Sequence, residues 1–361
     1  MIAYMDNVVL IGDLNIVKQA IVCFKELFTK IGLRLNLLKC VLLSTTSVST
    51  IVDGIEIQAK LYSIDAIRRL GSFLGNNDEI TKKLFQKLNS ISDKIDQIMN
   101  SDIQKHIKFT IIRLCFSSNF NHIFRSTNPL VTRPLAQKFN ELRAKVLSQL
   151  LGCKMFQIPD HAFLNPHYGG LGWTKASILT SCAFVGGCRN AIFEFSERFA
   201  DWEDLLMTTQ SSTVFALNEE ISKIDVEQWG RCFPQSFNGN IPEKNVLNLK
   251  YTLRTLQKRL TGMYENDLYN NICSSAVLNQ DLHSLLLEKG VCESKSSDSS
   301  LFVTIVPRRF GLCATNEAFV TKMRLYLNIP INQLLSKEKC ICSYCLYLFT
   351  STHFAPCSEL L

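Results

Sequence analysis

The chain opens on the stretch AYMDNVVLIG at residues 3–12. Apolar residues stand on both sides of the polar pair Asp6-Asn7, a pattern that predicts a strand, a tight turn and a second strand. Asp and Asn suit the turn because both tolerate left-handed backbone angles. We therefore expect a hairpin over residues 2–12 whose turn carries Asp6 and Asn7.

The residues that follow predict a helix and two further strand segments. Asp13 can cap a helix over about 13–31, and Gly32 can end it. The helix would carry an apolar face made of Ile16, Ala20, Phe24, Leu27 and Ile31. Residues 39–44 read as a short apolar strand, and Asp53-Gly54 is a strong hairpin signal within 51–57.

Beyond Gly75 the pattern becomes helical. Apolar residues recur at helical spacing from Ile80 to Ile98, which predicts an amphipathic helix. Further helices are expected at about 103–118 and 135–151, and three helices with short connections suggest a bundle. Residues 157–172 read as a loop, 174–207 as a long helical region, and 208–300 as helical with polar breaks.

Composition bounds the class of protein. The chain has 361 residues, a net charge of +7 and 14 cysteines. The moderate positive charge is compatible with a phosphate-bearing partner. The first residues lack the pattern of a signal peptide. The longest apolar run, 176–188, is too short for a bilayer, so we expect no membrane association. We expect an intracellular protein whose cysteines are thiols or metal ligands, and we expect the scattered cysteines to be buried thiols.

Several segments resemble retrotransposon reverse transcriptases of the non-LTR type, in the family's order. Residues 3–12 resemble the Tyr-x-Asp-Asp hairpin, with Tyr4 on the aromatic and Asp6 on the first carboxylate. Segments of the palm, the thumb and the region after the thumb follow. They read GLRLN at 32–36 with Lys39-Cys40, LGSFLG at 70–75, FNHIFRS at 120–126 and PHYGGLG at 166–172.

The resemblance implies a polymerase centre that holds two Mg²⁺ ions on carboxylates. The second turn carboxylate of the family falls on Asn7, which is a poor ligand for a hard dication because it is uncharged. The family's other catalytic Asp lies upstream of the hairpin, before Met1. We therefore expect Asp6 to be a remnant and the chain to be an inactive fragment, unless a second chain completes the palm.

The C-terminal tail predicts a zinc site. Cys342, Cys345, His353 and Cys357 form the pattern C-x2-C-x7-H-x3-C, in which two thiolates and a second pair can close a tetrahedron around Zn²⁺. Cys340 could replace Cys342 or Cys345. The preceding residues 319–330 loosely resemble the stretch that stands before a Cys-Cys-His-Cys unit in the same polyproteins. The site would be structural.

Basic residues on the predicted thumb are candidates for RNA or DNA binding. The resemblance to a polymerase thumb implies that the basic face of these helices follows the phosphate backbone of the template. A solvated face of mixed charge is an equally good interpretation, since acidic residues lie among the lysines. The candidates are Lys82, Lys83, Lys87, Arg113 and Arg125.

Together these patterns predict an α+β fold with a partial palm at 1–75, a helical thumb at 76–155, a helical connection region at 156–310 and a C-terminal helix with a zinc knuckle at 311–361. Three hypotheses follow. The chain is a degenerate reverse transcriptase fragment without activity of its own, a nucleic-acid-binding module, or a helical interaction protein.

Overall fold

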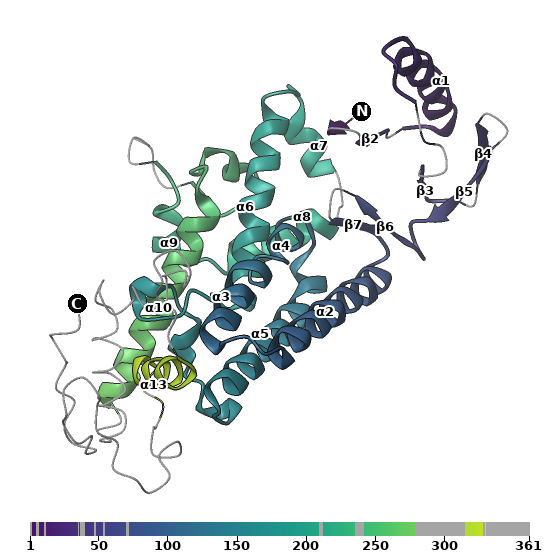
Figure 1. The fold of residues 1–361 in the computed structure, drawn as a ribbon. Helices are drawn as coiled ribbons and strands as arrows, with labels where there is room; N and C mark the ends of the chain where they lie inside the picture. The colour runs from purple at the N-terminus through teal and green to yellow at the C-terminus, as the bar shows by residue number, and fades with distance from the viewer. Residues whose placement is uncertain are drawn as a thin grey trace, which may run out of the picture. The chain divides into compact units, whose positions relative to one another are not determined.

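The structure is a computed structural model in which helices predominate and small sheets occupy the N-terminal part, so the coarse α+β assignment is confirmed (Figure 1). The described residues are 2–4, 7–10, 12–34, 36, 40–46, 48–52, 55–69, 72–208, 212–234, 242–278, 315–327 and 329.

The predicted N-terminal hairpin is present. Strand β1 (Ile2–Tyr4) pairs antiparallel with β2 (Asn7–Val9), and Tyr4 stands opposite Asn7. The expectation that Asn7 lies in the turn is therefore wrong, because its pairing with Tyr4 makes it the first residue of the second strand. Asp6 lies outside the described residues.

Helix α1 (Leu14–Lys30) begins and ends as the sequence predicts. The Asp13 carboxylate accepts a hydrogen bond from the Asn15 backbone at 2.8 Å, and Gly32 has a φ of 76°. The predicted apolar face, however, is not covered by the described chain. No residue of α1 is buried, and the side chains of Ile16 and Ile31 are 64% and 68% exposed.

The following strands form two small sheets. Strand β5 (Ile55–Leu61) lies between β3 (Leu42–Ser44), to which it is parallel, and β4 (Ser49–Val52), to which it is antiparallel. The hairpin predicted around 53–54 is thus confirmed by the pairing of Val52 with Ile55. A second hairpin, β6 (Ala66–Arg69) with β7 (Ser72–Gly75), was not assigned from the sequence.

The helices that follow Gly75 agree with the predicted periodicity. Helix α2 (Asn77–Asn100) buries the apolar residues from Ile80 to Ile95 that recur at helical spacing. Helices α3 (Lys105–Phe116) and α4 (Asn121–Ser126) follow. Helix α5 (Pro129–Leu151) starts earlier than predicted because the Asn128 side chain accepts a hydrogen bond from Leu130 at 2.9 Å and Pro129 suits a first helical turn.

The rest of the described chain is helical. Short 3-10 turns η2 (Met155–Gln157), η3 (Asp160–Phe163) and η4 (Pro166–Tyr168) fill the predicted loop. The helical region predicted over 174–207 is interrupted between Ser196 and Trp202. The remaining elements are α6 (Ala176–Ser196), α7 (Trp202–Thr208), α8 (Ser212–Ser222), α9 (Val226–Gly230), η5 (Leu247–Tyr251), α10 (Leu256–Leu278) and α13 (Asn316–Tyr326).

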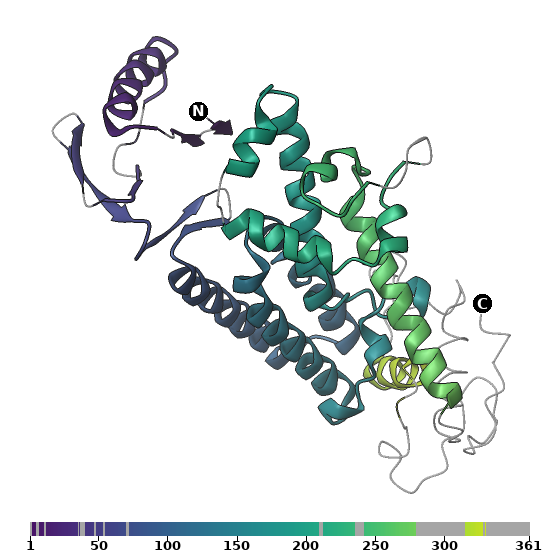
Figure 2. The same cartoon turned by 180° about the vertical axis from the view of Figure 1, so that it is seen from behind.

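Contacts divide the chain into two compact units that each draw on separate segments. One contains residues 1–93, 118–139 and 176–260, and the other contains 94–117, 140–175 and 261–361. In the first unit α6 packs against α4, α8 and η5. The helices α4, α6 and α8 are labelled in Figure 1 and are seen from behind in Figure 2. The four consecutive regions inferred from the sequence divide the chain differently and stay a prediction.

The apolar run at 176–188 forms the first part of helix α6, which extends to Ser196. Its 21 residues are long and apolar enough, by length and composition alone, to cross a membrane, and half of that stretch is buried inside the protein. Beyond Cys188 the helix carries Arg189, whose buried guanidinium donates to the Thr252 carbonyl at 2.7 Å. Its packing on three elements is typical of a core helix.

The loop before α6 is held by close backbone approach around Gly170. The Gly170 and Gly172 backbone N–H groups donate to the carbonyls of Asn165 at 3.1 Å and Leu164 at 2.9 Å. A Cβ at Gly170 would fall on the Leu164 carbonyl and lie 2.7 Å from the His161 carbonyl oxygen. Glycine is therefore required at position 170 by the space available.

Replacing Gly170 with alanine should lower the free energy of unfolding by about 1–3 kcal/mol, because the backbone of the loop must move apart. A matched change, Gly262→Ala, adds a methyl group inside α10 where no atom lies within 4 Å. It should raise stability by up to about 1 kcal/mol through helix propensity. Denaturant titration measures both; equal stabilities of the two variants would contradict the packing at Gly170.

Candidate functional site

The hairpin that resembles a polymerase turn does not form a described metal site. Asn7 lies in β2, and Asp6 is outside the described residues. Among the residues that the structure describes, no group of three or more His, Cys, Asp or Glu side chains could hold a metal ion. The four predicted zinc ligands, Cys342, Cys345, His353 and Cys357, also lie outside the described residues, as does Cys340.

Two of the three candidate lysines on α2 have internal partners. The Lys83 ammonium donates to the Ala66 carbonyl, and that of Lys87 donates to the Asn119 carbonyl at 3.1 Å. Burial lowers the pKa of Lys87, and the positive charge of Arg68 adds to this effect. Lys82 is exposed and lies 3.7 Å from the Glu79 carboxylate. Two of these cations thus hold the fold together, which leaves them less able to meet phosphates.

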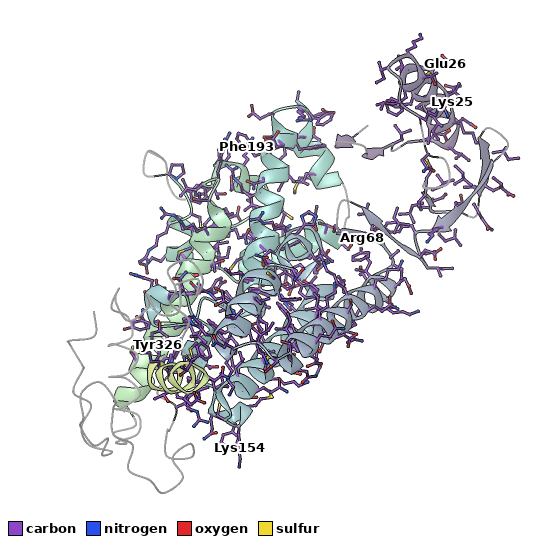
Figure 3. All side chains as sticks on the ribbon, in the orientation of Figure 1. Lys25, Glu26, Arg68, Lys154, Phe193 and Tyr326 are labelled. Atoms are coloured by element: carbon purple, nitrogen blue, oxygen red, sulfur yellow. The ribbon has the colours of Figure 1, made fainter. Side chains whose placement is uncertain are left out.

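The two candidate arginines are also engaged with the protein. Arg125 donates from Nε to the Gln257 side-chain oxygen at 2.7 Å. Burial lowers the pKa of Arg113, and Tyr326, which is labelled in Figure 3, opposes that shift. Nucleic-acid binding through these five residues stays a prediction. Three of them, Lys83, Lys87 and Arg125, also donate hydrogen bonds within the protein.

The C-terminal helix α13 is anchored by a buried arginine. Arg324 is fully buried and donates from Nε to the Leu151 carbonyl at 2.9 Å and from Nη2 to the Gly152 carbonyl at 2.6 Å. These carbonyls belong to the last turn of α5 and the residue after it, where helices lack internal donors. A cation there also meets the negative end of the helix dipole.

The same helix contacts the glycine-rich loop and α3. The Tyr326 hydroxyl donates to the Gly170 carbonyl at 3.2 Å. The Phe319 ring lies 5.9 Å from that of Phe109, which stacks on Trp173 at 5.5 Å between centroids. The segments 166–172 and 319–327, which are far apart in sequence, therefore meet in the folded chain.

Two buried ionisable groups lie at this loop: His161 belongs to the loop, and Glu265 lies on α10 and bonds to it. Glu265 accepts a hydrogen bond from the Thr174 hydroxyl at 2.6 Å, and burial raises the pKa of its carboxyl group. His161 is almost fully buried, and neither ring nitrogen has a hydrogen-bond partner among the described residues. Burial lowers the pKa of His161 to about 4, although Asp160 opposes the shift. The imidazole is therefore neutral at physiological pH.

The cysteines only partly match the expectation that scattered thiols are buried. Cys182 and Cys232 are buried, and burial raises the pKa of Cys232 to about 12. Cys23 and Cys115, however, are exposed, so the expectation is wrong for them. Both lie on amphipathic helices, where exposure depends on how the helix faces the core rather than on residue type.

Sequence reasoning missed a cluster of cations and aromatic rings in the first unit. The Arg189 guanidinium lies 4.8 Å from the centre of the Phe193 ring, and that of Arg254 lies 5.4 Å from it. The Lys250 ammonium lies 4.4 Å from the Trp202 ring and 5.0 Å from the Tyr251 ring. The run Lys250-Tyr251 with Arg254 close behind is the signal that could have pointed to it.

Acidification should destabilise the protein through His161. Its pKa in the folded state lies below the ordinary value near 6.5, so the unfolded chain takes up the proton first. Stability is complete above about pH 6.5 and is lost as the pH falls toward 4, by up to about 3 kcal/mol. Denaturant titrations at several pH values should show a flatter profile for His161→Gln. The exposed His167→Gln variant is the control, and an identical profile for all three proteins would contradict the assignment.

Comparison with protein families, curated proteins and solved structures finds no match for this chain. Its function is therefore inferred from its own residues and contacts.

Proposed function

We propose that this chain is part of a reverse transcriptase from a mobile element of the non-LTR type. In this proposal residues 1–75 are a partial palm, 76–155 the thumb, 156–310 a connection region and 311–361 a helix with a zinc knuckle. The observation that carries the proposal is the contact between two family-like segments. The Tyr326 hydroxyl bonds to the Gly170 carbonyl, and Arg324 caps α5.

The contact supports the proposal because unrelated sequence matches have no reason to meet in the folded chain. Helix α13 carries the Phe…Arg-Leu pattern, and the loop before α6 carries the glycine-rich pattern. The helix and the loop are about 150 residues apart in the sequence, so their contact is not a consequence of chain proximity.

The 361 residues themselves should not polymerise DNA. The resemblance requires carboxylates that bind two Mg²⁺ ions, and this hairpin provides one, at Asp6, because Asn7 takes the place of the second. Asparagine retains an acceptor oxygen but lacks the charge that a hard dication needs.

We expect no primer extension by the purified chain with primer-template, dNTPs and Mg²⁺ or Mn²⁺. The physical reason is that one carboxylate cannot fix two metal ions in the geometry of an in-line displacement. The assay follows incorporation of labelled nucleotide, with an active reverse transcriptase as positive control. Metal-dependent extension that vanishes in Asp6→Ala would overturn this proposal.

A second candidate function is nucleic-acid binding without catalysis. It is favoured by the net charge of +7 and by the cation–aromatic cluster at Phe193 and Tyr251. A helical interaction protein is the third, favoured by the uncovered apolar face of α1. Titration with an oligonucleotide separates them, because binding to phosphates must weaken steeply as the salt concentration rises.

We further propose that Cys342, Cys345, His353 and Cys357 hold a structural zinc ion. Native mass spectrometry of the full chain should find one zinc, and Cys345→Ser should lose it, since a tetrahedral site needs all four ligands. Cys340→Ser is the matched control and should retain the metal. A folded chain that carries no zinc would refute the site, and metal loss in Cys340→Ser would assign that thiol as a ligand.

A further inference from the structure

We propose that the surface formed by Phe193, Lys250, Tyr251 and Arg254, here called the arginine–aromatic surface, binds single-stranded nucleic acid. Bases would stack on Tyr251 and phosphates would meet Lys250 and Arg254. The inference rests on the nucleic-acid-binding function proposed above, and it assigns that function to residues other than those on α2, α3 and α4.

The surface is built on a rigid support. Arg189 on α6 is buried and donates to the Thr252 carbonyl from Nε at 3.1 Å and from Nη2 at 2.7 Å. The Thr252 hydroxyl in turn donates to the Leu249 carbonyl at 2.6 Å. These bonds fasten the end of η5, which carries Lys250 and Tyr251, to α6, the helix that carries Phe193. Arg189 is thus a positioning residue.

Two guanidinium groups share one aromatic ring. Arg189 and Arg254 both lie over Phe193, which is labelled in Figure 3, and the charge of Arg254 contributes after burial to the lowered pKa of Arg189. Among the residues that the structure describes, no carboxylate forms an ion pair with Arg254. The Arg254 guanidinium is exposed. An exposed, uncompensated guanidinium beside a second positive charge attracts an anion.

Tyr251 provides the stacking platform. Its side chain is 47% exposed, and the Lys250 ammonium lies over the ring. Every base has an aromatic face that can stack on such a ring, whereas bases in a duplex are already stacked and paired. The combination of an exposed ring with cations on both sides in sequence therefore fits an unpaired strand better than a duplex.

The negative charge of Glu203 should weaken the binding of a nucleic-acid strand at this surface. Its carboxylate accepts from the Lys250 ammonium at 3.2 Å and is exposed, so it competes with a phosphate for that cation. Two other nearby acids, Asp201 and Asp204, are exposed on the same stretch at the start of α7. Removing the charge of Glu203 should strengthen binding, an effect that loss of structure would not produce.

The test is fluorescence anisotropy of the full chain with a labelled oligo(dT) strand at several NaCl concentrations. Tyr251→Ala should weaken binding about fivefold or more, and Tyr251→Phe should restore it because phenylalanine also stacks. Arg254→Gln should weaken binding and reduce the slope of log K against log[salt] by about one. Glu203→Gln should bind more tightly than the unchanged chain.

A second exposed cation–aromatic pair provides the matched control. Lys154 lies 5.7 Å from the ring of Phe156, whose side chain is 81% exposed. Lys154→Gln and Phe156→Ala should leave binding unchanged. Thermal melting followed by circular dichroism reports whether each variant folds. If Tyr251→Ala does not fold, the proposal is decided by the affinities of Glu203→Gln, which should be higher, and of Tyr251→Phe, which should be unchanged.

The outcomes separate this proposal from the function on which it rests. Salt-dependent binding that all variants retain equally would overturn the arginine–aromatic surface and leave nucleic-acid binding standing. Equal loss in the Lys154 and Phe156 variants would also overturn it, because the effect would not be local. No binding by the unchanged chain or by Glu203→Gln would overturn both.

Discussion

A buried guanidinium must find carbonyl oxygens for its N–H groups, and this requirement organises both compact units. In one, Arg324 donates to two carbonyls at the C-terminal end of α5, those of Leu151 and Gly152, and fixes α13. In the other, Arg189 donates to Thr252 and fixes η5 to α6. Burying a charge without such partners is strongly unfavourable. Each arginine therefore holds two segments that are distant in the chain.

The same requirement changes how the net charge of the chain should be interpreted. The Arg143 guanidinium donates to the Thr174 carbonyl at 2.8 Å and to the Ser117 carbonyl at 2.9 Å. Burial lowers the pKa of Arg143 to about 9. Lys83, Lys87 and Arg125 also donate hydrogen bonds to acceptors within the protein. A count of positive residues thus overstates the charge that a polynucleotide could contact. The exposed guanidinium of Arg254 is one of the positive groups that a polynucleotide can reach.

The N-terminal segment presents the opposite situation. Its hairpins and α1 have the local features that their sequence specifies, but the apolar side of α1 is uncovered within the described chain. Exposed side chains such as Ile16 and Ile31 gain nothing from the hydrophobic effect until another surface covers them. A further apolar surface that covered them would therefore stabilise this part of the chain.

The sequence by itself determined the local features of this protein. The cap at Asp13, the glycine after α1, the hairpins β1–β2 and β4–β5 and the apolar stripe of α2 follow from interactions among near neighbours, which a sequence displays directly. The hairpin β6–β7, the early start of α5 and the break between α6 and α7 were less apparent, because their signals are single turns or caps.

Only the tertiary structure decided which side chains are exposed to solvent and which are buried or bonded within the protein. It placed Lys83, Lys87 and Arg125 against internal acceptors, buried His161, and exposed Cys23 and Cys115. It brought Lys250 over the Trp202 ring and Arg254 over the Phe193 ring. It also joined Tyr326 to Gly170. Burial and partnership depend on residues tens to more than a hundred positions away, and no local pattern records how such residues will meet.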